Sequence, residues 1–150
     1  MKDIVICDID GTISNPGDRL KYLKQDPPDW DSFYSDSFND ALIEPVADLV
    51  YTLIDAGYRI VYCTGRRSWC RTKTLGWLYR NDLIPDYDTS YLLMRKDGDL
   101  RPDAIIKPEL IAEAGITLDD VALILEDRSC MVKKYRELGF TCLQVAEGDF

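Results

Sequence analysis

Four groups of polar residues, each at or near the end of an apolar run, have the types and spacing of a phosphate-handling site. The first is the sequence DIDGT at 8–12, and the second is the sequence TGR at 64–66. The other two are Lys107 and the acidic pair at 126–127. Together these residue types predict phosphoryl transfer through an aspartyl-phosphate, because a carboxylate can attack phosphorus directly.

Each of these residues has a task in such a reaction. Asp8 can act as the nucleophile, and Asp10 can protonate the leaving oxygen and later deprotonate water. The Thr64 hydroxyl and the Lys107 ammonium can bind the remaining phosphate oxygens, where charge resides in the transition state. We therefore predict Asp8, Asp10, Thr64 and Lys107 as the catalytic residues.

A carboxylate that attacks a phosphate dianion needs a divalent cation to reduce the repulsion between them. Asp127 can hold such an ion, with Glu126 nearby. Oxygen ligands and a phosphate favour Mg²⁺ over a softer metal. The sequence therefore predicts a magnesium site beside the nucleophile.

Alternating strands and helices must position these groups. Apolar runs rich in β-branched residues predict strands at 4–9, 58–63, 90–94, 121–125 and 141–145. Helical patterns between them predict helices at 46–54, 68–81, from Pro108 to near Gly115, and from a Ser129 cap to Gly139. Such alternation favours a parallel sheet with helices on both faces, and ligands bind beyond the carboxyl ends of its strands.

Residues 14–40 do not fit this alternation. They contain three prolines, many Asp and Ser residues, and several aromatic residues that include Trp30, Phe33 and Tyr34. We interpret them as a flap inserted into a single domain of residues 1–150. The aromatic side chains could stack on a nucleobase or form the small core of the flap itself.

Composition excludes several function classes. Histidine is absent, which removes Ser-His-Asp triads and histidine zinc sites, and the five cysteines form no C-x-x-C pair. Eighteen basic residues against 27 acidic ones give a net charge of −9, which argues against binding to long nucleic acids and to anionic membranes. The N-terminus does not have the pattern of a signal peptide, and we expect a cytoplasmic protein.

The motifs resemble those of the haloacid dehalogenase superfamily of phosphohydrolases. Within it, nearly the whole chain resembles the 3′-phosphatase domain of polynucleotide kinase–phosphatases of the bacteriophage T4 type. The closer resemblance rests on DIDGT at 8–12, Arg19, TGR at 64–66, MRKDGD at 94–99 with Arg101 and Asp103, EDR at 126–128, and QVAEGDF at 144–150. The chain has no Gly-Lys dipeptide and hence no nucleotide-binding phosphate loop, so we expect the phosphatase without the kinase domain.

The resemblance implies a three-layer, Rossmann-like α/β fold with a central parallel five-stranded sheet and a small flap as a minimal cap. It implies a Mg²⁺-dependent phosphomonoesterase that acts on phosphorylated 3′ ends of nucleotides or nucleic acids, in the host cytoplasm if a phage encodes it. The metal ligands would be Asp8, the main-chain carbonyl of Asp10, Asp127 and, in place of a usual Asp, Glu126. The substrate would contact Arg19, Thr64, Gly65, Arg66, Asp103 and Lys107.

Three alternatives remain open from the sequence. The same chemistry could serve a nucleotidase that hydrolyses free nucleoside monophosphates. A phospho-accepting signalling domain uses similar residues, but its acidic pair precedes the acceptor in the chain, whereas here the pair at 126–127 follows Asp8. A non-catalytic module that binds nucleic-acid ends would not need both Asp8 and Asp10.

Overall fold

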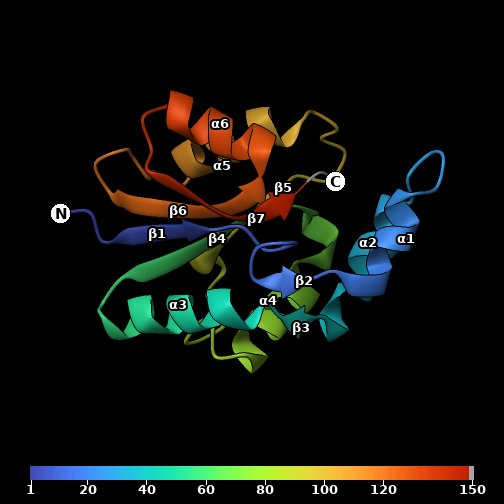
Figure 1. Cartoon of the computed structure of the whole chain (residues 1–150), viewed down its shortest axis with the longest axis horizontal. Coiled ribbons are helices and arrows are strands. Elements are labelled where there is room, and N and C mark those ends of the chain that lie inside the picture. Colours follow the sequence, from blue (N-terminus) through green and yellow to red (C-terminus); the bar gives the residue numbers. More distant parts are fainter. Residues whose placement is uncertain (149–150) are drawn as a thin grey trace.

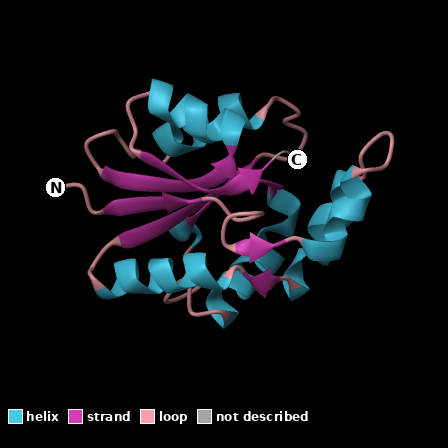
Figure 2. Ribbon diagram, viewed as in Figure 1, coloured by secondary structure: helices cyan, strands magenta, loops and turns pink. Residues whose placement is uncertain are grey.

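A central parallel sheet organises the protein, whose computed structural model describes residues 1–148. The five strands lie in the order β5-β4-β1-β6-β7, and Figure 2 shows them between two layers of helices. All neighbouring strands are parallel. The bounds are β1 Ile4–Cys7, β4 Arg59–Arg67, β5 Leu92–Arg95, β6 Val121–Arg128 and β7 Cys142–Gly148.

Four helices cover the two faces of the sheet. Helices α3 (Glu44–Asp55) and α4 (Arg71–Arg80) lie on one face, and α5 (Asp103–Glu113) and α6 (Ser129–Glu137) lie on the other (Figure 1). Short 3₁₀ helices, η3 (Ser68–Cys70) and η4 (Thr89–Tyr91), precede α4 and β5. The predicted five-stranded three-layer α/β fold is therefore confirmed.

A hydrophobic core lies on each face of the sheet. Trp77 and Leu78 of α4 are fully buried in one core, and Val132 and Tyr135 of α6 are buried in the other. These are the inward-facing residues that the helical periodicity predicts. Because both faces are covered, the strands are apolar on consecutive residues, as β1 is with its sequence IVIC.

Two differences in helix starts change the position of a residue that the sequence analysis singled out. Helix α5 begins at Asp103, five residues before Pro108, which lies inside the helix. Burial of Ile106, and of Ile111 in the core on that face of the sheet, outweighs the backbone hydrogen bond that the proline cannot make. Lys107 therefore lies on the helix and not in the loop before it.

Ser129 is the first residue of α6 and not its cap. The N-cap is Arg128, which makes no capping hydrogen bond with its side chain. The Ser129 hydroxyl instead lies 3.0 Å from Nε2 of Gln144 on the adjacent strand β7. The Ser129 hydroxyl, which the sequence pattern assigned to the helix cap, thus accepts a hydrogen bond from the sheet instead.

Residues 14–40, the predicted flap, hold short elements at the carboxyl end of the sheet. Strand β2 (Ser14–Asn15) pairs antiparallel with β3 (Ala41–Leu42), which brings the two ends of this segment together. Between them lie η1 (Gly17–Arg19), α1 (Leu20–Leu23), α2 (Trp30–Ser35) and η2 (Asp36–Asn39). Figure 1 shows α1 and α2 beyond the strand ends, on the side where ligands bind in such sheets.

Among residues 1–148, no helix has the length and apolar character needed to span a lipid bilayer.

Candidate active site

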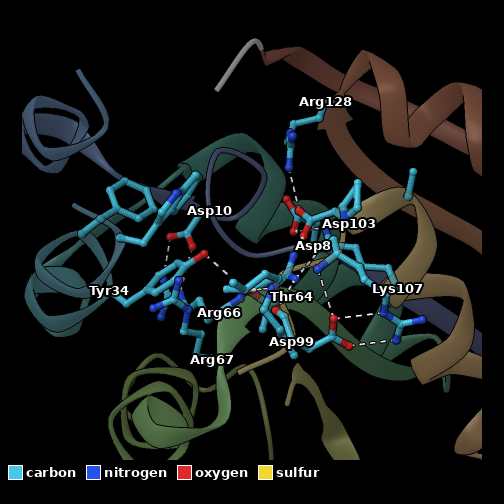
Figure 3. A pocket seen from close by; sticks show the side chains of 18 of the residues that line it. Asp8, Asp10, Tyr34, Thr64, Arg66, Arg67, Asp99, Asp103, Lys107 and Arg128 are labelled. Carbon is cyan, nitrogen blue, oxygen red and sulfur yellow. Dashed lines mark hydrogen bonds and ion pairs between the residues drawn. The ribbon is translucent and has the colours of Figure 1, made fainter. Parts of the chain in front are cut away.

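A cavity of about 430 Å³ opens at the carboxyl end of the sheet, and most of the predicted site residues line it. Arg19, Glu126 and Asp127 are not among the lining residues. Asp8 follows β1, Thr64 lies near the end of β4, and Lys107 projects from α5. Figure 3 shows these side chains pointing toward one another. They converge because β1 lies between β4 and β6, so residues far apart in the sequence meet at one edge.

Lys107 joins two of the acidic residues in the centre of the site. Its Nζ lies 2.8 Å from Oδ1 of Asp8 and 3.0 Å from Oε2 of Glu126, and all three side chains are buried. Burial alone would lower the pKa of Lys107, but Asp8 and Glu126 raise it well above its usual value. Lys107 is therefore a fixed positive charge beside the predicted nucleophile.

Glu126 makes hydrogen bonds with both of its carboxylate oxygens. Oε2 accepts from Lys107, while Oε1 accepts from the backbone N–H groups of Asp127 (3.1 Å) and Arg128 (3.2 Å). These bonds and the lysine outweigh burial and lower the pKa of Glu126. This arrangement suits a residue that orients Lys107.

Thr12 connects Asp8, the predicted nucleophile, to Asp127, a role that the sequence did not reveal. Its Oγ1 lies 2.9 Å from Oδ2 of Asp8 and 3.1 Å from Oδ1 of Asp127, and its side chain is fully buried. The only signal in the sequence was its place at the end of DIDGT. Gly11, with φ of +82°, makes the turn that returns Thr12 toward Asp8.

The acidic residues of this cluster fit a magnesium ion. Carboxylate oxygens of Asp8, Glu126 and Asp127 lie within 4.8 Å of one another, and all three residues are buried. Burial and the charge of Glu126 raise the pKa of Asp127 to about 6 and that of Asp8 well above its usual value. Lys107 alone does not balance three carboxylates, and oxygen donors with excess negative charge suit a hard divalent cation.

Asp10 points away from this cluster and toward two arginines. Arg66 binds it with two nitrogens, Nε to Oδ2 at 2.9 Å and Nη2 to Oδ1 at 2.7 Å, and Nη2 of Arg19 lies 2.7 Å from Oδ1. Burial alone would raise the pKa of Asp10, but the two guanidinium groups lower it to about 2. In this arrangement Asp10 is ionised, and Figure 3 shows it beside Arg66 and Tyr34.

Arg19 lies in the flap and also bonds to Asp40, a residue that the sequence reasoning missed. Its Nε lies 2.8 Å from Oδ1 of Asp40, and its Nη1 lies 2.5 Å from the carbonyl oxygen of Phe33. Arg19 and Arg66 are almost fully buried. Both predicted substrate-binding arginines thus donate to carboxylates; Arg19 also donates to the flap backbone, and Arg66 donates to the Thr74 hydroxyl at 3.2 Å.

Asp103 lies between two arginines at the wall of the cavity. It forms a short ion pair with Arg95, and Nη1 of Arg128 lies 2.6 Å from its Oδ2. A Cβ on Gly65 would be 2.6 Å from Oδ1 of Asp103, so a larger residue at 65 would have to displace this carboxylate from its position between the two arginines. The carbonyl of Gly65 also accepts hydrogen bonds from Nε of Arg95 (3.0 Å) and the Tyr34 hydroxyl (3.3 Å).

The structure thus brings Asp8, Thr64, Lys107, Glu126 and Asp127 together around one centre. Thr64 is buried and its hydroxyl accepts the backbone N–H of Arg66 at 3.1 Å. Asp10, Arg19 and Arg66 form an adjoining network, and Asp103 and Gly65 form the wall beside it. The tail at 144–150, which contributes to the family resemblance, ends on Asp149 and Phe150, and these two residues lie outside the described residues.

Comparisons with known proteins agree with this arrangement. The family "Polynucleotide kinase PNKP phosphatase domain" matches residues 2–150. A putative bifunctional polynucleotide kinase/RNA ligase of Autographa californica nuclear polyhedrosis virus is 26% identical over 134 residues, which is 89% of this chain and 18% of that protein.

Solved structures are similar along nearly the whole chain. A chain of the Pnkp1/Rnl/Hen1 RNA repair complex is 36% identical with a TM-score of 0.78, covering 98% of this chain and 43% of that one. A chain of a second Pnkp1/Rnl/Hen1 complex is 35% identical with a TM-score of 0.80, covering 100% and 48%. A predicted phosphatase from Clostridium acetobutylicum shares the fold at 17% identity, with a TM-score of 0.67 over 96% of this chain and 84% of that one.

This chain spans less than half of the length of the first three relatives, and the part that it matches is a phosphatase domain. The five-stranded sheet, the buried Asp8–Lys107 pair and the acidic residues at 126–127 are all found within the matched residues. The chain therefore belongs to the polynucleotide kinase PNKP phosphatase domain family of haloacid dehalogenase phosphatases, which are hydrolases of phosphate monoesters.

Proposed function

We propose that this protein is a Mg²⁺-dependent phosphomonoesterase that removes 3′-phosphates from nucleotide or polynucleotide ends through a phosphorylated Asp8. The observation that carries the proposal is the buried group of Asp8, Lys107 and Asp127. A carboxylate nucleophile there has an ammonium 2.8 Å away and a second carboxylate close enough to share a cation. Membership in the phosphatase family supports the general reaction.

The first step transfers the phosphoryl group to the protein. An Asp8 oxygen attacks phosphorus, the bond from phosphorus to the 3′ oxygen breaks, and Asp10 supplies the proton that this oxygen takes up. Lys107 and the Thr64 hydroxyl bind the equatorial phosphate oxygens. Asp8, Asp127 and the Asp10 carbonyl would hold magnesium, which would supply the positive charge that reduces the repulsion between Asp8 and the phosphate dianion.

The second step hydrolyses the phosphorylated Asp8 and regenerates the free carboxylate. A water molecule attacks the same phosphorus, its proton passes to Asp10, and the bond from phosphorus to Asp8 breaks. Inorganic phosphate leaves and Asp8 is free again. Asp10 can act as an acid in the first step only if its carboxyl group moves away from Arg66 and Arg19, because both arginines hold it ionised.

The 3′ preference and the place of action rest on resemblance. One similar chain occurs in a structure described as an RNA repair complex, and another occurs in a second Pnkp1/Rnl/Hen1 complex. We therefore propose repair of nucleic-acid ends, in a cytoplasm, as the setting. The cavity of about 430 Å³ has the size of a small-ligand pocket and would also admit a free nucleoside monophosphate. This favours nucleotidase activity as the second candidate function.

A panel of substrates tests the proposal. Phosphate release is measured from 3′- and 5′-phosphorylated mononucleotides and oligonucleotides, with Mg²⁺ and with EDTA. We expect faster hydrolysis of 3′-phosphates, loss of activity in EDTA, and no turnover by Asp8→Asn, while Asp119→Asn on the exposed surface remains active.

Each contrary result has a separate meaning. A preference for free 5′-nucleotides would assign the protein to the nucleotidase alternative. Full activity in EDTA would exclude the magnesium site. More than a few per cent of activity in Asp8→Asn would exclude Asp8 as the nucleophile.

A further inference from the structure

The cavity beside Asp8 is larger than a phosphate group requires, and its far wall is aromatic. Trp30, Phe33 and Tyr34 of the flap line it together with Asp8 and Lys107. We propose that Trp30 is the platform on which the nucleobase of the phosphorylated terminal nucleotide stacks. This inference rests on the proposed function and specifies how that function recognises its substrate.

Two of the three aromatic residues already have structural tasks. Phe33 is 1% exposed, and the guanidinium of Arg19 lies 4.2 Å from its ring centroid. Tyr34 is 7% exposed, and its hydroxyl lies 3.3 Å from the carbonyl oxygen of Gly65. Both therefore belong to the small core of the flap, as one of the two interpretations of these residues expected.

Trp30 differs because it is only partly buried. It is the first residue of α2, and its ring contacts Tyr34 in a stacked arrangement (5.8 Å between centroids, 30° between planes). Phe33 meets it edge to face, with centroids 5.8 Å apart and planes at 88°. These contacts hold the indole in place, and Trp30 is one of the residues that line the cavity.

The spacing of the two ends of the cavity is fixed by a chain of contacts. Trp30 stacks on Tyr34, Tyr34 is bonded to Gly65, and Gly65 follows Thr64, which we assign to the phosphate. An aromatic platform at a set distance from a phosphate site suits a nucleotide better than a small sugar phosphate. Every base presents a π-face, so such a platform does not select among sequences.

Substrates with and without a terminal base test the inference. A short 3′-phosphorylated oligonucleotide is compared with the same strand whose last nucleotide is abasic. Stacking on an aromatic side chain contributes about 1–3 kcal/mol per base. We therefore expect Trp30→Ala to lower kcat/KM about tenfold on the normal strand and to leave the abasic strand nearly unchanged, with Trp30→Phe recovering most of the loss.

Trp69 provides the matched control. It is 44% exposed and does not line the cavity, so Trp69→Ala should behave as the wild type on both strands. Equal losses in Trp30→Ala on the two strands would overturn the inference, because the tryptophan would then act on the fold of the flap. A wild type that hydrolyses neither strand would instead refute the proposed function.

Binding without turnover gives a second measurement. In the Asp8→Asn background, we expect Trp30→Ala to weaken binding of a 3′-mononucleotide about tenfold and to leave binding of inorganic phosphate unchanged. An unchanged dissociation constant for the 3′-mononucleotide would also overturn the inference.

Discussion

At the scale of single residues, the two aspartates of DIDGT occupy opposite electrostatic environments although only one residue separates them. Asp8 lies among carboxylates, and burial with Glu126 raises its pKa. Asp10 lies between Arg66 and Arg19, which lower its pKa to about 2. A divalent cation would favour the ionised form of Asp8, whereas a proton reaches Asp10 only after its arginine contacts loosen.

The loss of activity on substitution of Asp10 should therefore depend on the leaving group. We expect Asp10→Asn to lower kcat on a 3′-nucleotide by about 10²- to 10⁴-fold, because an alkoxide leaves poorly without a proton. The loss should be smaller on p-nitrophenyl phosphate, whose phenolate needs less protonation. Steady-state rates on both substrates, with Asp119→Asn as the surface control, make the comparison; equal losses would contradict the acid role.

Glu126 and Asp127 should differ in their response to magnesium. Since Lys107 and two backbone N–H groups already bond to Glu126, we expect Glu126→Gln to lower kcat without changing the Mg²⁺ concentration that gives half-maximal activity. Asp127→Asn should raise that concentration at least about tenfold, as loss of a carboxylate ligand does. Magnesium titrations of both variants test this difference. A similar rise in the half-maximal Mg²⁺ concentration in both would show that Glu126 is a ligand.

At the scale of elements, the site depends on how closely β7 approaches β6. A Cβ built on Gly148 would lie 2.1 Å from Oδ2 of Asp127 and 3.1 Å from its backbone carbonyl carbon. Gln144, on the same strand, donates to the carbonyl oxygen of Asp127 at 3.0 Å. This explains in physical terms why the tail from Gln144 to Gly148 belongs to the motif: it fixes the position of Asp127.

A methyl group at Gly148 should therefore damage metal binding more than the fold. We expect Gly148→Ala to displace Asp127 and to raise the Mg²⁺ requirement, with little change in the melting temperature. Gly76→Ala is the control, because it lies in α4 and its new Cβ would meet only Phe38, at 3.4 Å. An unchanged magnesium titration in Gly148→Ala would show that the carboxylate is not held by this contact.

At the scale of the whole molecule, the protein is acidic, and most basic residues in and near the cavity form ion pairs with carboxylates. Arg101 binds Asp99 and Glu109, and Lys96 binds Glu113. Arg95 uses its donors on Asp103 and on backbone carbonyls. Arg67 and Arg128 also line the cavity, and each uses one guanidinium nitrogen in an ion pair, with Asp31 and Asp103 respectively. Their other guanidinium nitrogens can therefore meet the phosphates of a strand.

The salt dependence of catalysis should therefore be shallow. Each phosphate neutralised on a single strand contributes about −0.7 to the slope of log affinity against log salt. With two such arginines we expect a slope of about −1.4 in kcat/KM for a long 3′-phosphorylated strand relative to a 3′-mononucleotide. Arg128→Ala should reduce its magnitude by about 0.7.

Lys133→Ala, an exposed change on α6, should leave the slope unaltered. A steep slope that persists in Arg128→Ala would indicate a basic track elsewhere on the surface.

The sequence by itself determined the order of strands and helices along the chain and located the motif that carries the predicted nucleophile. These features are local: apolar runs mark buried strands, and a motif such as DIDGT is read along the chain. Its resemblance to a known family predicted the fold, and the structure and the comparisons agree. The predicted helix starts, including those at Pro108 and Ser129, were all placed within five residues.

Only the tertiary structure decided what each polar group faces. Arg19 and Arg66 carry the charge of phosphate ligands, yet they lie against Asp10 because the flap and β4 meet there. Thr12 bonds to Asp127, 115 positions away, through the pairing of β1 with β6. Ion pairs and hydrogen bonds depend on distances of a few ångströms between segments that are remote in the sequence. The local periodicity of the sequence does not determine those distances.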